Sequence, residues 1–165
     1  EVTVSVEIGK LKPHSIMNTW LLHLQTCAYS NCQRKTILVS RSNSFTKQDQ
    51  YEISIKFGSI PKENALLILE KIYSMVEQGN IHCWPIPPYS GWEIAKAIFV
   101  KKTLGHEAFK RKWLGSFGRD GESINPEMRL CFGDNCGVNI FLESEIFLNC
   151  LNDLYKPLFS NLVMK

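Results

Sequence analysis

The chain lacks any long apolar run. None of its apolar stretches approaches the roughly eighteen residues that a membrane-spanning helix requires, and no charged segment followed by an apolar one marks a secretory signal. Internal repeats and low-complexity tracts are also missing. These absences favour a soluble globular protein, and we expect it to be cytoplasmic and to bind no membrane.

The cysteines lack the spacing of a common zinc site. Cys27 and Cys32, like Cys131 and Cys136, are separated by four residues, whereas two intervening residues allow both sulfurs to reach one zinc ion. A zinc site built from these two pairs remains an alternative. We expect instead that all six cysteines are unbridged thiols and that the protein holds no metal or cofactor.

The length is that of one domain. A chain of 165 residues buries about two thirds of its unfolded surface in a single core. We therefore expect one domain over 1–165, with an α/β core at 1–80 and a proline-rich segment followed by helices at 81–165. Because the chain opens at Glu1 without a methionine and enters an alternating apolar segment at once, we expect a C-terminal fragment of a longer subunit.

Periodicity predicts the elements of the first half. Residues 2–8 and 51–57 alternate apolar and polar side chains, and 35–40 contains a short apolar run, so all three are expected to be strands. The polar stretch 41–50 is expected to be a turn or loop. Helices are expected to begin at Pro13 and at Pro61. The residues expected to face the core are Ile16, Trp20, Leu24, Cys27, Tyr51, Ile53, Ile55, Phe57, Leu66, Leu69, Ile72, Tyr73 and Val76.

The second half is expected to be mainly helical. Helices are predicted at 91–104 and 106–114, and 147–159 forms a closing amphipathic stretch that contains Pro157. Residues 115–126 are rich in Gly, Ser, Asp and Asn, which predicts an exposed loop.

Positive charge is concentrated in one segment. From Lys96 to Arg119 seven basic residues face one acid, Glu107, which gives a local charge of +6, whereas 134–165 carries −2. Such a segment suits a DNA backbone or an acidic partner, and a solvated helix face is the alternative. The candidate DNA-binding residues are Lys101, Lys102, Lys110, Arg111 and Lys112.

Aromatic residues interleave with this basic segment, as in grooves that stack single-stranded bases. The helical spacing of Trp92 and Phe99 favours packing in the core for those two. Trp84, Tyr89 and Phe117 are the candidates for partner binding, and base stacking and packing remain open for Tyr89 and Phe117.

Residues 81–133 carry a family resemblance. A proline-rich approach at Pro85, Pro87 and Pro88 leads through Ser90 and Gly91 into a helix. It is followed in order by Ala108, Trp113, Gly115, Gly121-Glu122, Asn125-Pro126, Arg129-Leu130 and Phe132-Gly133. This pattern resembles the C-terminal domain of the exodeoxyribonuclease V gamma subunit, the RecC family.

The resemblance implies a degenerate restriction-endonuclease-like core, a PD-(D/E)xK nuclease fold that has lost its active site. Working relatives place a carboxylate and a lysine around one spacer residue, but Glu7 and Lys10 are separated by two, so on one strand they would face opposite sides. Glu52 and Lys56 share a face but stand about 13 Å apart along a strand. We therefore expect no catalytic residue.

The resemblance also implies a function. It is that of a non-catalytic scaffold in a RecBCD-type helicase–nuclease, which acts in double-strand break repair and recombination. The implied partners are RecB- and RecD-type subunits and, through the complex, double-stranded DNA ends and forks. A metal-dependent DNA nuclease and a free-standing binding module are the alternatives. The four histidines have no motif that links them to a cysteine or serine nucleophile.

Overall fold

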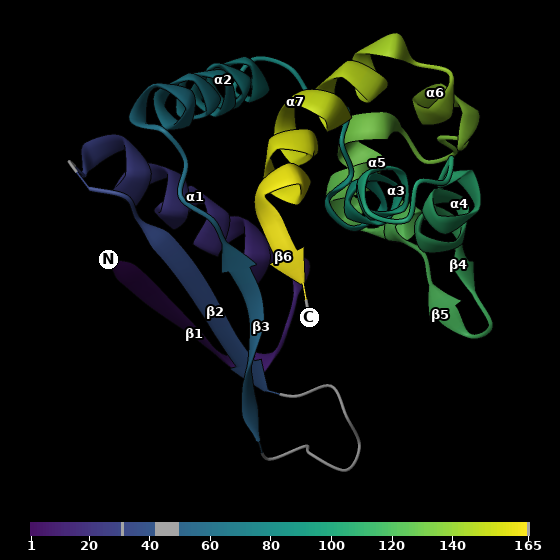
Figure 1. Cartoon of the computed structure of the whole chain (residues 1–165). Helices are drawn as coiled ribbons and strands as arrows, with labels where there is room; N and C mark the ends of the chain where they lie inside the picture. The colour runs from purple at the N-terminus through teal and green to yellow at the C-terminus, as the bar shows by residue number, and fades with distance from the viewer. Residues whose placement is uncertain (31, 42–49, 165) are drawn as a thin grey trace. The chain divides into compact units, whose positions relative to one another are not determined.

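The computed structural model describes residues 1–30, 32–41 and 50–164, and it divides into two compact units (Figure 1). The first unit comprises Glu1–Tyr73 together with Asn161–Lys165, and the second comprises Ser74–Ser160. Most of the turn expected at 41–50 lies outside the described residues. The expectation of one domain over 1–165 stays a prediction.

The first unit is a mixed four-stranded sheet with one crossover helix. Its strands lie in the order β1-β2-β3-β6; β1 and β2 are parallel, and the other neighbours are antiparallel. Helix α1 joins β1 to β2, because two parallel strands need a crossover connection. The elements are β1 Val2–Lys10, α1 Pro13–Tyr29, β2 Lys35–Arg41, β3 Tyr51–Phe57 and β6 Leu162–Met164.

Helix α1 supplies the core of this unit. It begins at Pro13, where the missing backbone N–H would have no helical partner. All four residues of its predicted apolar stripe are buried, and the Trp20 ring packs 5.2 Å from the ring of Phe57 on β3. The prediction for this helix is confirmed.

A buried histidine joins α1 to the sheet. The side chain of His23 is fully buried, its Nδ1 lies 2.9 Å from Thr36 Oγ1 on β2, and its ring stacks on Phe57. Burial lowers the pKa of His23, because removing the ring from water disfavours its charged form. The residue is therefore a neutral packing group with a satisfied hydrogen bond.

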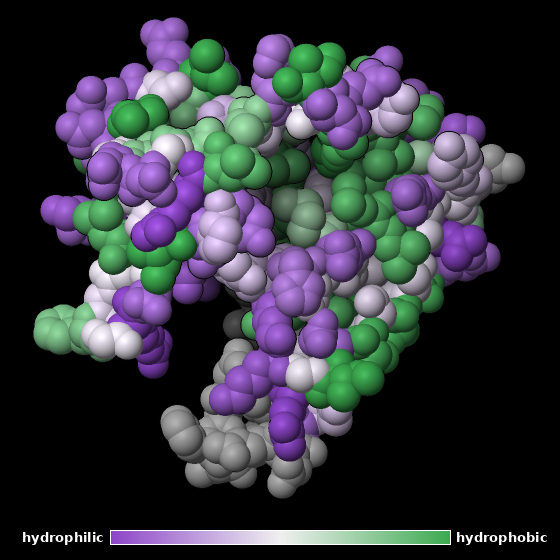
Figure 2. Space-filling view, turned by 180° about the vertical axis from the view of Figure 1, so that it is seen from behind, coloured by the Kyte–Doolittle hydropathy of each residue, from purple (hydrophilic) through white to green (hydrophobic). Residues whose placement is uncertain are grey.

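Strand β1 buries its polar side chains and exposes its apolar ones. Val2, Val4, Val6 and Ile8 are 55, 60, 63 and 80% exposed, whereas the intervening polar residues are half-buried. Figure 2 shows the apolar row as a green band at the lower right. The alternation predicted the strand correctly, but not which side of it is covered.

A bulge changes the facing of residues on β3. Leu38 pairs with Ile55, but the next residue, Val39, pairs with Ile53, so Ser54 is an extra residue. Ile55 and Phe57 are buried as predicted, whereas Tyr51 is half-exposed. The inward prediction is wrong for Tyr51 and for Ile53, which pairs with half-buried Val39, because one extra residue reverses the alternation beyond it.

Helix α2 (Lys62–Gly79) matches its predicted bounds but not its predicted burial. Only Ala65 is buried, and Leu66, Tyr73 and Val76 are exposed. Periodicity predicts which residues share a helix face, but it does not supply the surface that covers them.

Within the described part of the chain, no helix is both long enough and apolar enough to cross a bilayer.

The second unit packs helices around an aromatic cluster. Trp113 and Phe141 have ring centroids 4.9 Å apart, and Phe109 meets Phe147 edge-on at 5.5 Å. The elements are α3 Pro88–Phe99, α4 His106–Leu114, β4 Gly115–Ser116, β5 Arg119–Asp120, a 3-10 helix Glu122–Ile124, α5 Pro126–Phe132, α6 Asn139–Leu142 and α7 Glu145–Asn161.

Two predictions for this unit need correction. Helix α3 ends at Phe99 and not at 104, because the chain turns back through Lys102, whose φ is +56°. Residues 115–126 were predicted to be an exposed loop. Most of these residues are exposed as predicted, but they form a short hairpin and a 3-10 helix that contains the buried side chain of Glu122.

The carboxylate of Glu122 caps helix α3. It accepts hydrogen bonds from the Tyr89 N–H at 2.9 Å, and from the N–H and Oγ of Ser90 at 2.6 Å each. These N–H groups have no partner within the helix, and a negative charge there also meets the positive end of the helix dipole. Gly121 allows this placement, because a Cβ would lie 2.2 Å from the Trp113 carbonyl oxygen.

We expect Glu122→Ala to destabilise the protein by roughly 2–3 kcal/mol, because it leaves buried N–H donors without an acceptor. The measurement is the free energy of unfolding in urea. Glu127→Ala, which removes an exposed carboxylate from the first turn of α5, is the control and should change stability by less than about 0.5 kcal/mol. Equal losses in the two variants would contradict the capping role.

Candidate functional site

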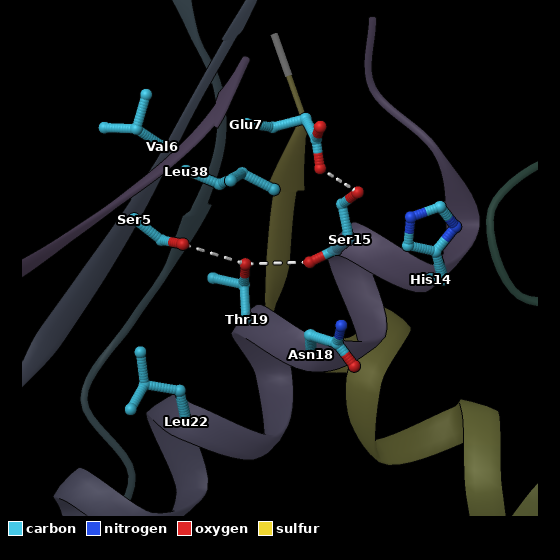
Figure 3. A pocket seen from close by; sticks show the side chains of 9 residues that line it. All are labelled: Ser5, Val6, Glu7, His14, Ser15, Asn18, Thr19, Leu22 and Leu38. Carbon is cyan, nitrogen blue, oxygen red and sulfur yellow. Dashed lines mark hydrogen bonds between the residues drawn. The ribbon is translucent and has the colours of Figure 1, made fainter. Parts of the chain in front are cut away.

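A polar pocket lies between β1 and α1 in the first unit (Figure 3). Its volume is 310 Å³. Because β1 turns its polar side chains toward α1, most of the lining is polar. The lining residues are Ser5, Val6, Glu7, His14, Ser15, Asn18, Thr19, Leu22 and Leu38.

Glu7 is the carboxylate of this pocket. It accepts a hydrogen bond from the Ser15 hydroxyl and a weaker one from the Gly9 N–H at 3.4 Å. The bond from Ser15 is the largest cause that holds the pKa of Glu7 below its usual value, because it stabilises the charged carboxylate. The Ser15 proton thus points at a carboxylate and not at an imidazole, which differs from an activated serine nucleophile.

Lys10 does not join this site. The burial of β1 alternates through its whole length, so Lys10 lies on the exposed side with Ile8, and it is not among the pocket's lining residues. Glu52 and Lys56 are both exposed on β3. Among the residues that the structure describes, no three His, Cys, Asp or Glu side chains gather as a metal site would require.

The structure brings together only part of the predicted DNA-binding set. Lys110, Arg111 and Lys112 lie on α4, whereas Lys101 and Lys102 lie in the turn after α3, and all five are exposed. Arg111 and Lys112 line a second pocket, of 380 Å³, with Glu93, Ala108, Gly115, Ser116, Arg119 and Asp120.

Arg119 was not among the predicted candidates. It enters this pocket because the β4–β5 hairpin folds back beside α4. The turn pair Phe117-Gly118 is not one of the usual hairpin signals such as Asn-Gly, so the local sequence does not predict this hairpin.

The three aromatic candidates differ in their surroundings. Trp84 is half-buried. Tyr89 is half-exposed, and the Lys112 Nζ lies 5.6 Å from the centre of its ring. Phe117 is fully exposed at the end of the hairpin. The last two are therefore accessible side chains next to basic residues.

The cysteines are free thiols in different environments. Cys27 and Cys150 are buried, and Cys83 and Cys131 are exposed. A hydrogen bond with the Cys83 thiol is the main cause that raises the pKa of Cys131. The expectation that all six thiols are unbridged and metal-free in the cell stays a prediction.

We expect Ser15→Ala to raise the pKa of Glu7 toward its ordinary value, because the variant removes the strongest hydrogen bond to the carboxylate. The measurement is an NMR titration of the Glu7 carboxyl carbon. Asn18→Ala, which also alters the pocket lining, is the control and should leave the titration unchanged. An unshifted Glu7 in Ser15→Ala would show that this hydrogen bond is absent in solution.

Comparison with known proteins identifies the family. Residues 1–99, from β1 to the end of α3, match the family model described as the RecC C-terminal domain. No curated protein matches the chain. RecC proteins are subunits of exodeoxyribonuclease V, a RecBCD-type complex of DNA repair and recombination. With more than half of its length matched, the chain belongs to the RecC family through the C-terminal domain of that subunit.

Proposed function

We propose that this chain is a non-catalytic scaffold domain of a RecBCD-type helicase–nuclease. It holds RecB- and RecD-type subunits, and it shapes the path of DNA ends and forks through its basic segment during double-strand break repair. Membership of the RecC family supports a place in such a complex. The inactivated PD-(D/E)xK origin of the core is part of the same proposal.

The open apolar face of the sheet is the observation that carries this proposal. Parallel strands are normally covered on both faces, but α1 covers only one face of the parallel pair β1–β2. On the other face, exposed Val4 pairs with Ile37 and exposed Val6 with Val39, which makes the apolar surface continuous across the two strands. Continuous exposed apolar surface of this kind marks a protein interface.

The occupant that we assign to this face is an apolar surface of a partner subunit. A subunit of a multi-protein complex buries such surface on assembly, and a central apolar patch supplies most of the binding free energy of an interface. The row from Val2 to Ile8 bears no charged side chain, but the register places exposed Lys35 beside Val2 and exposed Lys56 beside Ile37 on the same face. A partner surface that is apolar at its centre and acidic at its edge therefore fits this face best.

The environment of Glu7 supports the non-catalytic part of the proposal. A metal-dependent nuclease needs a carboxylate that is free to bind the ion and a lysine that faces the same site. Glu7 instead accepts the Ser15 hydroxyl, and Lys10 lies on the other side of β1.

We expect Val4→Asp/Val6→Asp in the gamma subunit to lower co-purification with the RecB- and RecD-type subunits at least tenfold, because burying charge against an apolar surface is unfavourable. Val4→Thr/Val6→Thr retains the side-chain shape and should have a smaller effect. Leu130→Asp is the matched control, since Leu130 is 88% exposed on α5 in the second unit and is not part of the sheet. Undiminished assembly of the Asp variant would contradict the docking role of this face.

We also expect the chain to leave single- and double-stranded DNA uncut in Mg²⁺ or Mn²⁺. The measurement is release of labelled fragments over hours at high protein concentration. Metal-dependent cleavage that disappears in Glu7→Ala would establish the alternative, a metal-dependent nuclease.

A further inference from the structure

The pocket between α4 and the β4–β5 hairpin has the character of an anion site. Three cations line it, Arg111, Lys112 and Arg119, together with the carboxylates of Glu93 and Asp120. Neither carboxylate forms an ion pair with these cations in the part of the chain that the structure describes. Three cations that form no such ion pair therefore line one cavity of 380 Å³ together with two carboxylates, and the lining has a net charge of +1.

The types of cation favour a phosphate group. A guanidinium presents a planar set of donors that matches two phosphate oxygens, and an ammonium adds a point charge. The Lys112 ammonium also lies 5.6 Å from the centre of the Tyr89 ring, within the range of a cation–π contact. Two guanidinium groups and one ammonium group of the pocket are therefore available to bind a phosphodiester.

The turn of the hairpin provides a second, independent observation. The register of β4 and β5 leaves Phe117 and Gly118 as a two-residue turn, with φ of +40° and +74°. Positive φ at both positions is usual for Asn-Gly. It is unusual for a bulky aromatic residue, so Phe117 is strained in this conformation.

The strained aromatic residue makes no compensating contact in the chain. Phe117 is fully exposed, so its ring buries no area within the fold. The side chain nevertheless stands two residues from Arg119 and next to Ser116, both of which line the pocket. An exposed flat ring in the turn between two residues that line a cation-bearing cavity suits the two parts of a nucleotide, the base and its backbone phosphate.

We propose that this pocket and Phe117 together bind single-stranded nucleic acid. Arg111, Lys112 and Arg119 hold a backbone phosphate, and Phe117 stacks on the adjacent base. An unpaired base has a free face for the ring, whereas a base inside a duplex is already stacked on its neighbours, so the site selects single strands. The proposal deepens the DNA-path part of the proposed function and rests on it, but it requires no partner subunit.

The site lies mostly beyond the residues that the family model matches. Of its members, only Tyr89 and Glu93 fall within 1–99. The site is thus a property of this chain's second unit. It also narrows the predicted DNA-binding set, because Lys101, Lys102 and Lys110 do not line the pocket.

The test measures fluorescence anisotropy of a labelled oligothymidylate of about twelve nucleotides, titrated with the 165-residue chain at several salt concentrations. We expect Arg111→Gln/Lys112→Gln/Arg119→Gln to weaken binding at least tenfold. The slope of log affinity against log salt should fall by about 0.7, because the contact to one backbone phosphate is removed from a single strand. Lys101→Gln/Lys102→Gln/Lys110→Gln removes the same amount of charge outside the pocket. The affinity of this variant for the oligothymidylate should fall less than about threefold.

A second variant separates stacking from charge. Phe117→Leu keeps an apolar side chain without a π face, and we expect a loss of about tenfold with an unchanged salt slope. Phe117→Trp should retain the affinity. Thermal unfolding of each variant verifies that the fold is intact. An unaltered affinity in Phe117→Leu would overturn the stacking contact.

The remaining outcomes distinguish this inference from the proposed scaffold. Equal losses in the two triple variants would mean that affinity comes from diffuse charge, which overturns the pocket site and leaves the scaffold standing. Equal competition by duplex DNA or by polyglutamate would overturn selectivity for single strands. Single-strand binding that behaves as expected, together with assembly that survives Val4→Asp/Val6→Asp, would refute the docking face alone.

Discussion

The packing of helix α1 on one face of the sheet is the constraint on which the first unit depends. Strands β1 and β2 are parallel, so the chain must cross between them, and the contact of Trp20 with Phe57 holds the crossover helix in place. A single helix covers a single face. The polar pocket at Glu7 therefore lies on the face of β1 that α1 covers, and the exposed side chains of Val4 and Val6 lie on its uncovered face.

The polar contact between β1 and α1 is the less usual part of this arrangement. A strand normally turns its apolar row toward the helix that covers it, but here hydroxyl groups and a carboxylate lie between the two elements. The bonds Ser15–Glu7 and Thr19–Ser5 supply partners for these groups, which limits the free-energy cost of removing them from water. The apolar row of β1 is left exposed on its other face.

One short segment of the second unit combines stability with exposure. At the end of residues 117–122, Glu122 is buried and caps α3. Phe117, at the start of the same segment, is exposed at the hairpin turn. Between them, Arg119 completes the cluster of cations with Arg111. Because the buried carboxylate anchors one end of the segment, the exposed end can present side chains in a defined position.

By itself the sequence determined the strands near 35–40 and 51–57, the apolar stripe of α1, the bounds of α4 and the family. The elements are carried by local periodicity and the family prediction by the motif order at 81–133, of which the family model matches only the part up to residue 99. Only the tertiary structure decided which side of β1 is covered, since alternation is the same for either side. It also decided that Glu122 reaches Ser90, 32 residues away, and that two of five candidate cations meet Arg119. Contacts between distant residues depend on how elements pack, and local periodicity carries no information about that packing.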